Sequence, residues 1–149
     1  MTTADVTVRR MQKEDLDRVS QIESECFSTP WSRNAFEDIL DNPSALYMVA
    51  EENGYIIGNC GIIAAVGEGD KCNVAVDKDI RKRGVGEKLV SEVMKAASKE
   101  LNVEAFTLEV RASNKAAISL YEKLGFVSEG IRPGFYTAPR EDAMIFWKR

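Results

Sequence analysis

The sequence predicts one α/β domain over residues 1–149, built on a mixed sheet with the order β-α-α-β-β-β-α-β-α-β-β. Three observations lead to this fold class. The spacing of apolar residues alternates between two and about 3.6 residues, which indicates strands interleaved with helices. Asn53-Gly54 joins two apolar runs and is a strong hairpin signal. Residues 76–105 place a helical pattern between two strands, which is typical of a parallel βαβ crossover.

The first third of the chain predicts a strand followed by two helices. Residues 5–11 alternate valine with polar residues, which indicates an opening strand. Helical spacing then relates Leu16, Val19, Ile22 and Cys26. Pro30 should end this helix, because proline cannot continue the hydrogen-bond ladder. Ser32 can cap a second helix, whose apolar residues are Phe36, Ile39 and Leu40.

The middle of the chain predicts an antiparallel meander of three strands. The first two are expected over residues 46–51 and 55–66. Gly67-Glu68-Gly69-Asp70 has the composition of a turn, and a shorter strand is expected over 72–76. Short connections of this kind favour antiparallel pairing of neighbouring strands.

The second half predicts two helices alternating with strands. After Gly86 an amphipathic helix is indicated by Leu89, Val90, Val93, Met94 and Ala97. A strand over 105–110 precedes a helix that carries Ala117, Leu120, Tyr121 and Leu124 and ends at Gly125. Two strands, over 126–136 and 142–147, complete the sheet. Ligands favour the carboxyl ends of parallel strands, where the segment 81–86 is expected to lie.

Composition excludes several kinds of chemistry. The chain contains no histidine, which removes Ser–His and Cys–His nucleophile pairs, histidine bases and His-containing zinc sites. No metal is therefore expected. No run approaches about 20 apolar residues, and the three separated cysteines suit a reducing compartment, so we expect a cytoplasmic protein without a membrane partner. The net charge of −4 argues against a nucleic-acid-binding domain.

A basic, glycine-containing turn opens the central helix. Arg81-Lys82-Arg83-Gly84-Val85-Gly86 combines cations, backbone N–H groups that glycine leaves accessible, and the positive end of a helix. This environment suits a pyrophosphate. The turn is not a Walker A loop, because no Gly-Lys-Ser/Thr follows, and it lacks the third glycine of a dinucleotide fingerprint. Taken alone, it is equally compatible with a charged surface loop, and less so with a nucleic-acid patch.

Its surroundings resemble one enzyme family. Asn73-Val74-Ala75-Val76-Asp77 with 81–86 resembles the acetyl-CoA-binding segment of the GCN5-related N-acetyltransferase (GNAT) superfamily. Leu108 to Asn114, with Ala117, Tyr121, Gly125 and Phe126, resembles the second half of that core. Residues 27–32 and the run Tyr136…Arg140-Glu141-Asp142-Ala143 are most similar to RimI-type ribosomal-protein-alanine acetyltransferases. The resemblance spans nearly the whole chain and implies a GNAT-like fold.

The resemblance also implies a donor, acetyl-CoA, and a set of residues that handle it. The implied donor-binding residues are Val74, Ala75, Val76, Arg81, Lys82, Arg83, Gly84, Val85, Gly86, Glu87 and Asn114. Glu109 would be the general base and Tyr121 the acid that protonates the departing thiolate. Judged from the residues alone, Glu109 is more readily an exposed strand carboxylate and Tyr121 a core aromatic, while Asn114 is equally a helix cap.

For the acceptor, the resemblance implies a protein N-terminus, most specifically the N-terminal alanine of the small-subunit ribosomal protein S18. Trp31 and Tyr136 could line its groove, although core packing accounts for Trp31 equally well. Phe135 stands where RimI-type enzymes carry the first tyrosine of a pair. Three alternatives remain open: an acetyltransferase for small amines or lysine side chains, a non-catalytic acyl-CoA-binding module, and a nucleic-acid binder.

Overall fold

The protein folds around a mixed sheet whose two faces are covered by helices. The computed structural model describes residues 6–27, 30–71, 74–80 and 84–149. The helices are α1 (Leu16–Cys26), α2 (Arg33–Leu40), α3 (Val85–Glu100) and α4 (Lys115–Lys123), preceded by the short 3-10 helix η1 (Lys13–Asp15). The strands are β1 (Val6–Arg10), β2 (Ala45–Glu52), β3 (Tyr55–Ala65), β4 (Glu68–Lys71), β5 (Ala75–Val76), β6 (Ala105–Arg111), β7 (Val127–Tyr136) and β8 (Glu141–Lys148).

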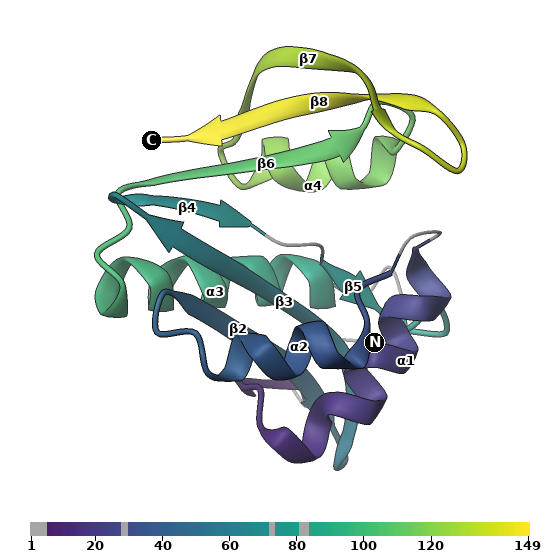
Figure 1. Cartoon of the computed structure of the whole chain (residues 1–149), viewed down its shortest axis with the longest axis vertical. Helices are drawn as coiled ribbons and strands as arrows, with labels where there is room; N and C mark the ends of the chain where they lie inside the picture. Colours follow the sequence, from purple (N-terminus) through teal and green to yellow (C-terminus); the bar gives the residue numbers. More distant parts are fainter. Residues whose placement is uncertain (1–5, 28–29, 72–73, 81–83) are drawn as a thin grey trace.

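The sheet has the order β1-β2-β3-β4-β6-β8-β7, with β5 paired to β3 beside this path. The β4–β6 pair is parallel and the other pairs are antiparallel. Helix α3 packs with one face of the sheet through a core that includes Leu89, Val93 and Phe146. Helices α1 and α2 cover the other face through Val19, Ile22, Phe36, Tyr47 and Val49. Figure 1 shows this layering, with α1 and α2 in front of β2 and β3 and α3 behind them.

The predicted hairpin and the first two helices are confirmed. Asn53 and Gly54 both have positive φ (53° and 82°), as a two-residue hairpin turn requires. The Ser32 hydroxyl oxygen accepts a hydrogen bond from the Ala35 N–H (3.1 Å) and caps α2. Helix α1 ends at Cys26, before Pro30.

The predicted turn over 67–70 is wrong for 68–70, which belong to a strand, and the strand predicted over 72–76 is present over Ala75–Val76, with residues 72–73 outside the described part of the chain. The chain turns at Val66 and Gly67, whose φ values are 51° and 78°, so β4 begins at Glu68. Gly69 lies inside this strand for a packing reason, because a Cβ there would meet Ile62 at 2.6 Å. Glycine at this position makes room for a neighbouring side chain. A second short strand, β5, follows over Ala75–Val76.

The central crossover is parallel, as predicted, but its partners differ from the prediction. Strand β6 pairs with β4, through Glu68 with Ala105 and Asp70 with Thr107, and β5 pairs only with β3 among the described residues. The strand that leads directly into α3 is therefore not the strand that β6 joins. This separation opens the sheet in the middle.

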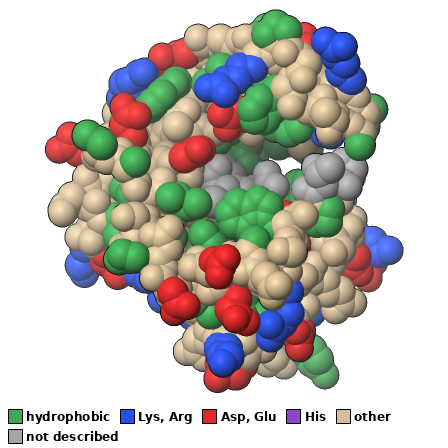
Figure 2. All heavy atoms as spheres, viewed as in Figure 1, with side chains coloured by type: hydrophobic (Ala, Val, Ile, Leu, Met, Phe, Trp, Pro, Cys, Tyr) green, Lys and Arg blue, Asp and Glu red, His purple; other side chains and the backbone are tan. Residues whose placement is uncertain are grey.

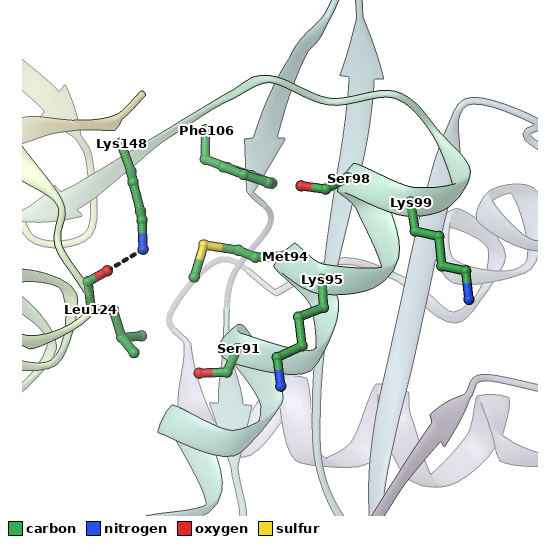
Figure 3. Close-up of a pocket in the computed structure, with 8 residues that line it drawn as sticks. All are labelled: Ser91, Met94, Lys95, Ser98, Lys99, Phe106, Leu124 and Lys148. Atoms are coloured by element: carbon green, nitrogen blue, oxygen red, sulfur yellow. Dashed lines mark hydrogen bonds between the residues drawn. The ribbon is translucent and has the colours of Figure 1, made fainter.

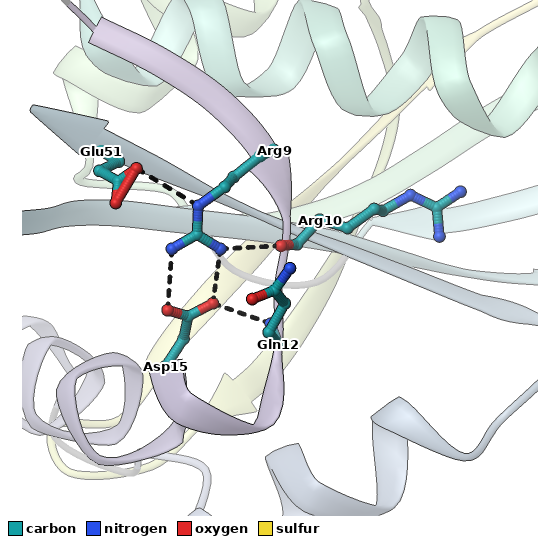
Figure 4. Close-up of polar contacts among 5 residues, drawn as sticks. All are labelled: Arg9, Arg10, Gln12, Asp15 and Glu51. Atoms are coloured by element: carbon teal, nitrogen blue, oxygen red, sulfur yellow. Dashed lines mark hydrogen bonds and ion pairs between the residues drawn. The ribbon is translucent and has the colours of Figure 1, made fainter. Parts of the chain in front are cut away.

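A partly buried ion pair ties β1 to the start of α1 (Figure 4). The Arg9 guanidinium donates to both carboxylate oxygens of Asp15, at 2.8 and 3.0 Å, and to Glu51 at 3.4 Å. The Gln12 N–H donates to Asp15 as well, at 2.8 Å. Burial favours the neutral acid, but the Arg9 and Gln12 hydrogen bonds outweigh it and lower the pKa of Asp15.

Candidate active site

The sheet parts at the carboxyl end of the β4–β6 pair. Their ladder ends at Asp70 and Thr107, after which β6 continues against β8 while β5 follows β3. Figure 1 shows β4 and β6 starting together and diverging toward their arrowheads. Figure 2, in the same view, shows the surface hollowed between the upper part of the molecule, with β6 to β8 and α4, and the part below it. Glu109 lies on β6, one of the two strands that part here, while Tyr136 on β7 and Trp31 before α2 come from elements outside this strand pair.

Helix α3 begins at this opening with an uncapped glycine. Gly84 has φ 80° and ψ 10°, a left-handed conformation that favours glycine, and it supplies no side-chain cap. Val85 is buried and anchors the first turn in the core, while Gly86 would place a Cβ 3.7 Å from Leu120 of α4. The first turn of α3 is thus held in place by Val85 while its N-cap residue supplies no side-chain hydrogen bond. The cations Arg81, Lys82 and Arg83 lie outside the described residues.

An exposed ion pair links the first turn of α3 to the last turn of α4. Lys123 Nζ lies 3.0 Å from Glu87 Oε2. Glu87 therefore contributes a contact between helices, in addition to any part it has in binding a donor. The Asn114 side chain caps α4, because its Oδ1 accepts from the Ala117 N–H at 3.2 Å. The capping interpretation of Asn114 is confirmed.

Strand β5 presents one edge toward the opening. Ala75 is buried and pairs with Asn59 of β3, and Val74 and Val76 are partly buried. On the described part of the chain, no strand pairs with the other edge of β5. The Val76 carbonyl accepts from the Cys26 thiol at 3.4 Å, which brings the end of α1 over this strand. A one-sided strand edge offers backbone N–H and C=O groups to an extended ligand.

Glu109 lies on the sheet face opposite α3. Along β6, Phe106, Leu108 and Val110 are buried in the core beneath α3, and Thr107 and Glu109 alternate with them. Burial raises the pKa of Glu109 above its usual value, and the nearby carboxylate of Asp70 raises it further. Arg132 opposes this shift by attraction. A half-buried carboxylate with a raised pKa has the character of a general base.

Tyr121 is a core residue on the α3 side of β6. It is 4% exposed and packs edge-on against Phe126, with ring centroids 5.7 Å apart, and near Phe146 at 6.4 Å. The core-aromatic interpretation of its ring is therefore confirmed. Tight packing also restricts where the hydroxyl can point.

The two predicted acceptor residues belong to different parts of the molecule. Trp31 packs with Phe36 (5.5 Å) and Tyr47 (6.4 Å) in the core beneath α1 and α2, and its backbone N–H donates to Glu23. Tyr136 lies at the end of β7, edge-on to Phe135, with the Arg111 guanidinium 4.4 Å from its ring centroid. Core packing accounts for Trp31, whose ring contacts Phe36 and Tyr47, whereas the ring of Tyr136 lies against Phe135 and Arg111.

Sequence reasoning missed two charged neighbours of Glu109. Asp70 lies on β4, and the sequence places it in a turn, where a strand-face position cannot be foreseen. Arg132 lies on β7, opposite Ala143 of β8. The position of Asp70 beside β6 follows from the register of the β4–β6 pair. That register can be assigned only when β4 is recognised as a strand that starts at Glu68.

A separate groove of about 640 Å³ lies on the other side of β6 (Figure 3). Figure 3 shows Met94, Phe106 and Leu124 around its floor, with lysines from α3 and β8 near its edge. Its lining consists of Ser91, Met94, Lys95, Ser98, Lys99, Phe106, Leu124 and Lys148. None of these was predicted as a site residue, and Lys148 is engaged with the Leu124 carbonyl.

Two further features bear on function. Across residues 6–27, 30–71, 74–80 and 84–149, no group of three or more acidic, histidine or cysteine side chains could hold a metal ion. Within the same ranges, no helix is long and apolar enough to cross a membrane.

A parted parallel pair, an uncapped helix start and a perturbed carboxylate define an acyltransferase-like site. Comparison with known proteins places the chain more closely. Residues 16–126 match the model of the acetyltransferase (GNAT) family. The chain is 38% identical over 141 residues to a Bacillus subtilis (strain 168) protein provisionally named as a ribosomal protein bS18-alanine N-acetyltransferase, covering 94% of this chain and 93% of that protein.

Two solved structures extend the similarity. The E. coli ribosomal-protein-S18-alanine N-acetyltransferase superposes with a TM-score of 0.86 at 33% identity, over 95% of this chain and 92% of that one. Ard1 from Thermoplasma volcanium gives a TM-score of 0.87 at 26% identity, over 97% of both chains. This chain belongs to the GNAT family of acetyltransferases, enzymes that use acetyl-CoA as acyl donor.

Proposed function

We propose that this enzyme transfers the acetyl group of acetyl-CoA to the α-amine of a protein N-terminus, namely the N-terminal alanine of ribosomal protein bS18. The observation that carries the proposal is similarity over more than nine-tenths of both chains to the E. coli enzyme that bears this activity in its name. The site described above supplies groups suited to each step.

The start of α3 and the side of β5 away from β3 would bind the donor. The backbone N–H groups from Gly84 to Gly86 and the positive end of the helix dipole would bind the pyrophosphate of CoA. The cations Arg81 to Arg83 would add charge there. Backbone groups of Val74, Ala75 and Val76 suit the amides of the pantetheine arm, which would lie along the side of β5 away from β3. Asn114 would contribute its amide nitrogen, since its oxygen caps α4.

Glu109 would act as the base for the attacking amine. A peptide α-amine has a reference pKa of about 7.7–8.0, so it must lose a proton before it attacks the thioester carbonyl. That proton passes to the Glu109 carboxylate, directly or through a water. The raised pKa of Glu109 brings it closer to that of the amine, which makes the transfer more favourable.

Tyr121 would protonate the leaving group. When the C–S bond of the tetrahedral adduct breaks, the sulfur takes the bonding electrons and needs a proton. The Tyr121 hydroxyl would donate it, and the phenolate would recover its proton from solvent. The ring's fixed position against Phe126 and Phe146 would hold the hydroxyl in a constant direction.

The acceptor chain would lie across the face that carries Glu109. Tyr136, held by Arg111, stands at the β7 end of this face and would contact the acceptor backbone. Trp31 would act from the α1–α2 side by supporting the shape of the groove through its core contacts. Phe135, which has no hydroxyl, would contribute only apolar contact.

An acceptor panel tests this function. Purified enzyme is given acetyl-CoA and, separately, peptides with the bS18 N-terminal sequence, the same peptides with a blocked α-amine, free lysine, and spermidine. We expect kcat/KM for the alanine-starting peptide to exceed that for the other acceptors by at least about 100-fold. Efficient turnover of lysine or spermidine, without turnover of the peptide, would rule out the N-terminal assignment.

Two substitutions test the catalytic roles. Glu109→Gln and Tyr121→Phe should each lower kcat by about 100-fold or more, the usual contribution of a general base or acid. The dissociation constant of acetyl-CoA should stay within about threefold, because neither side chain is proposed to bind the donor. If kcat is unchanged in both variants, the mechanism is wrong even where the substrate is right.

A further inference from the structure

A second carboxylate shares the sheet face of Glu109. In the parallel β4–β6 ladder, Asp70 is opposite Thr107, and Glu109 follows two residues later on β6. Residues two apart on a strand point to the same face, so Asp70 and Glu109 are diagonal neighbours on one surface. Strand and residue spacings put their Cα atoms about 8 Å apart. Both stand where the ladder ends and the sheet opens.

Among the residues that the structure describes, a cation on another strand also acts on Glu109. From β7, Arg132 attracts the Glu109 carboxylate, and this attraction is weaker than the combined effect of burial and Asp70. On β8 the residue opposite Glu109 is Ile145, which carries no charge. Arg111, on β6 itself, donates to the Pro139 carbonyl and to Glu141. The Glu109 carboxylate therefore responds more strongly to its carboxylate neighbour and its burial than to the cation.

We propose that Asp70 and Glu109 form an acidic pair that receives the acceptor's terminal amine as its ammonium cation, with Asp70 as a positioning residue and Glu109 as the proton acceptor. The inference rests on the proposed function, since it assumes that Glu109 is the base. Beyond the proposed function, it specifies that the acceptor enters as an ammonium cation and that Asp70 selects this protonated form.

The chemistry of the pair balances. Near neutral pH most of an α-amine is protonated, because its reference pKa is about 7.7–8.0. The ammonium would enter between two carboxylates and reduce their repulsion. One N–H bond then breaks, its proton joins a Glu109 oxygen, and nitrogen keeps the electron pair that attacks the thioester. The pair is left with one proton and one negative charge. The direction of the Glu109 pKa shift, raised by burial and then by Asp70, agrees with this arrangement.

The test compares pH profiles of kcat/KM for the wild-type enzyme and the variants Asp70→Asn, Asp70→Glu and Glu68→Gln. Glu68 is a matched control, because it is an exposed carboxylate on the same strand and face, one step farther from Glu109. In Asp70→Asn the acid limb should move to lower pH by about 0.5–1 unit, since Glu109 loses a like-charged neighbour. The KM for the peptide should rise about fivefold or more, with the KM for acetyl-CoA unchanged.

Asp70→Glu keeps the charge and should keep the wild-type acid limb, and Glu68→Gln should match the wild type in both quantities. If Asp70→Asn shows the same acid limb and peptide KM as Glu68→Gln, the acidic pair is overturned. The pair is also overturned if Asp70→Glu behaves like Asp70→Asn, because the position would then act through shape. A Glu109→Gln enzyme that keeps its rate and its acid limb would instead overturn the proposed base.

Discussion

At Glu109, catalysis and stability make opposite demands. Its pKa in the folded protein is raised, mainly by burial, so folding favours the protonated form. Between the unfolded pKa, about 4.3, and the higher folded value, the folded state binds more protons, and stability falls as pH rises. The ionised carboxylate that the proposed mechanism needs therefore destabilises the fold at neutral pH.

Glu109→Gln is accordingly expected to be as stable as the wild type at pH 7, or more stable, while losing activity. The difference should disappear below about pH 4, where the wild-type side chain is neutral in both states. Urea unfolding at pH 7 and at about pH 3.5 measures it. A variant that is destabilised at pH 7 by more than about 1 kcal/mol would show that the carboxylate makes stabilising hydrogen bonds, against this account.

Residue types and spacing alone did not decide the roles of single residues, because some roles depend on local pattern and others on contacts between distant segments. Tyr121 and Asn114 each have a structural role, as ring packing and as helix cap, and these were foreseeable from local pattern. Asp70 was not, because its significance depends on which residue of β6 it faces. Cross-strand register is a non-local property, and a single sequence does not encode it in any short window.

At the scale of the element, a substitution that alters the backbone can test whether the start of α3 binds the donor. Gly84 needs a left-handed conformation, which disfavours a side chain by about 1–2 kcal/mol. Gly84→Ala should raise the KM for acetyl-CoA about five- to tenfold, because the helix start shifts relative to the pyrophosphate. Gly67→Ala is the control: Gly67 has a similar φ of 78° and open space around it, and it is not among the residues proposed to bind the donor.

Both glycine variants should lose a similar amount of stability, measured by thermal unfolding. The KM for acetyl-CoA should rise only in Gly84→Ala. An equal rise in KM for both would mean that donor binding responds to general destabilisation. That result would remove α3 from the proposed donor site.

The ion pair between Arg9 of β1 and Asp15 of η1 should make the stability of the fold sensitive to acid. The pKa of Asp15 is lowered in the folded state, so its contribution is present above the unfolded value of about 3.9 and is lost as pH falls through the lower folded value. Asp15→Asn should lower the free energy of unfolding at pH 7 by about 2–3 kcal/mol, since the Arg9 guanidinium loses a charged acceptor.

Chemical denaturation from pH 2 to pH 7 checks this, with Asp17→Asn as control. Asp17 pairs with Arg33 on the surface and is 86% exposed, so its loss should change stability little. The gap between wild type and Asp15→Asn should narrow toward pH 2. A gap that stays constant over the whole range would contradict the ionic origin of the stabilisation.

Elements with strong local signals were predicted well, and the β4–β5 region was not. Apolar periodicity, the Ser32 cap and Asn53-Gly54 act within a few residues, so the helices and the hairpin could be placed. Strand β4 contains Gly69, which composition assigns to a turn, whereas the glycine is there because Ile62 packs against the strand. That contact joins two strands and is invisible to a window of neighbouring residues.

At the scale of the molecule, the fold places the proposed donor and acceptor residues on opposite faces of one sheet. The core beneath α3 holds Tyr121 and anchors Val85 at the start of the proposed donor site. The other face carries Glu109 and Asp70 and is bordered by the core that contains Trp31. Donor and acceptor would approach from these two sides and meet where β4 and β6 part. The proposed site thus depends on the divergence of β4 and β6, which leaves a gap in the sheet.

The fold is shared with a solved structure whose named acceptor differs, so the fold alone does not choose an acceptor. Spermidine N-acetyltransferase from Vibrio cholerae superposes with a TM-score of 0.83 at 18% identity, a similarity of fold. Similarity to ribosomal-protein acetyltransferases extends to sequence, at 34–38% identity. The choice of a protein N-terminus is therefore the central claim, and it must be measured on proteins.

The most direct measurement is mass spectrometry of protein N-termini in cells of the source organism with and without this gene. The account predicts that the N-terminal alanine of ribosomal protein bS18 is acetylated in the parent and unmodified in the deletion strain. Restoring the wild-type gene should restore the acetyl group, and restoring Glu109→Gln should not. A bS18 N-terminus in the same state in both strains would contradict the claim.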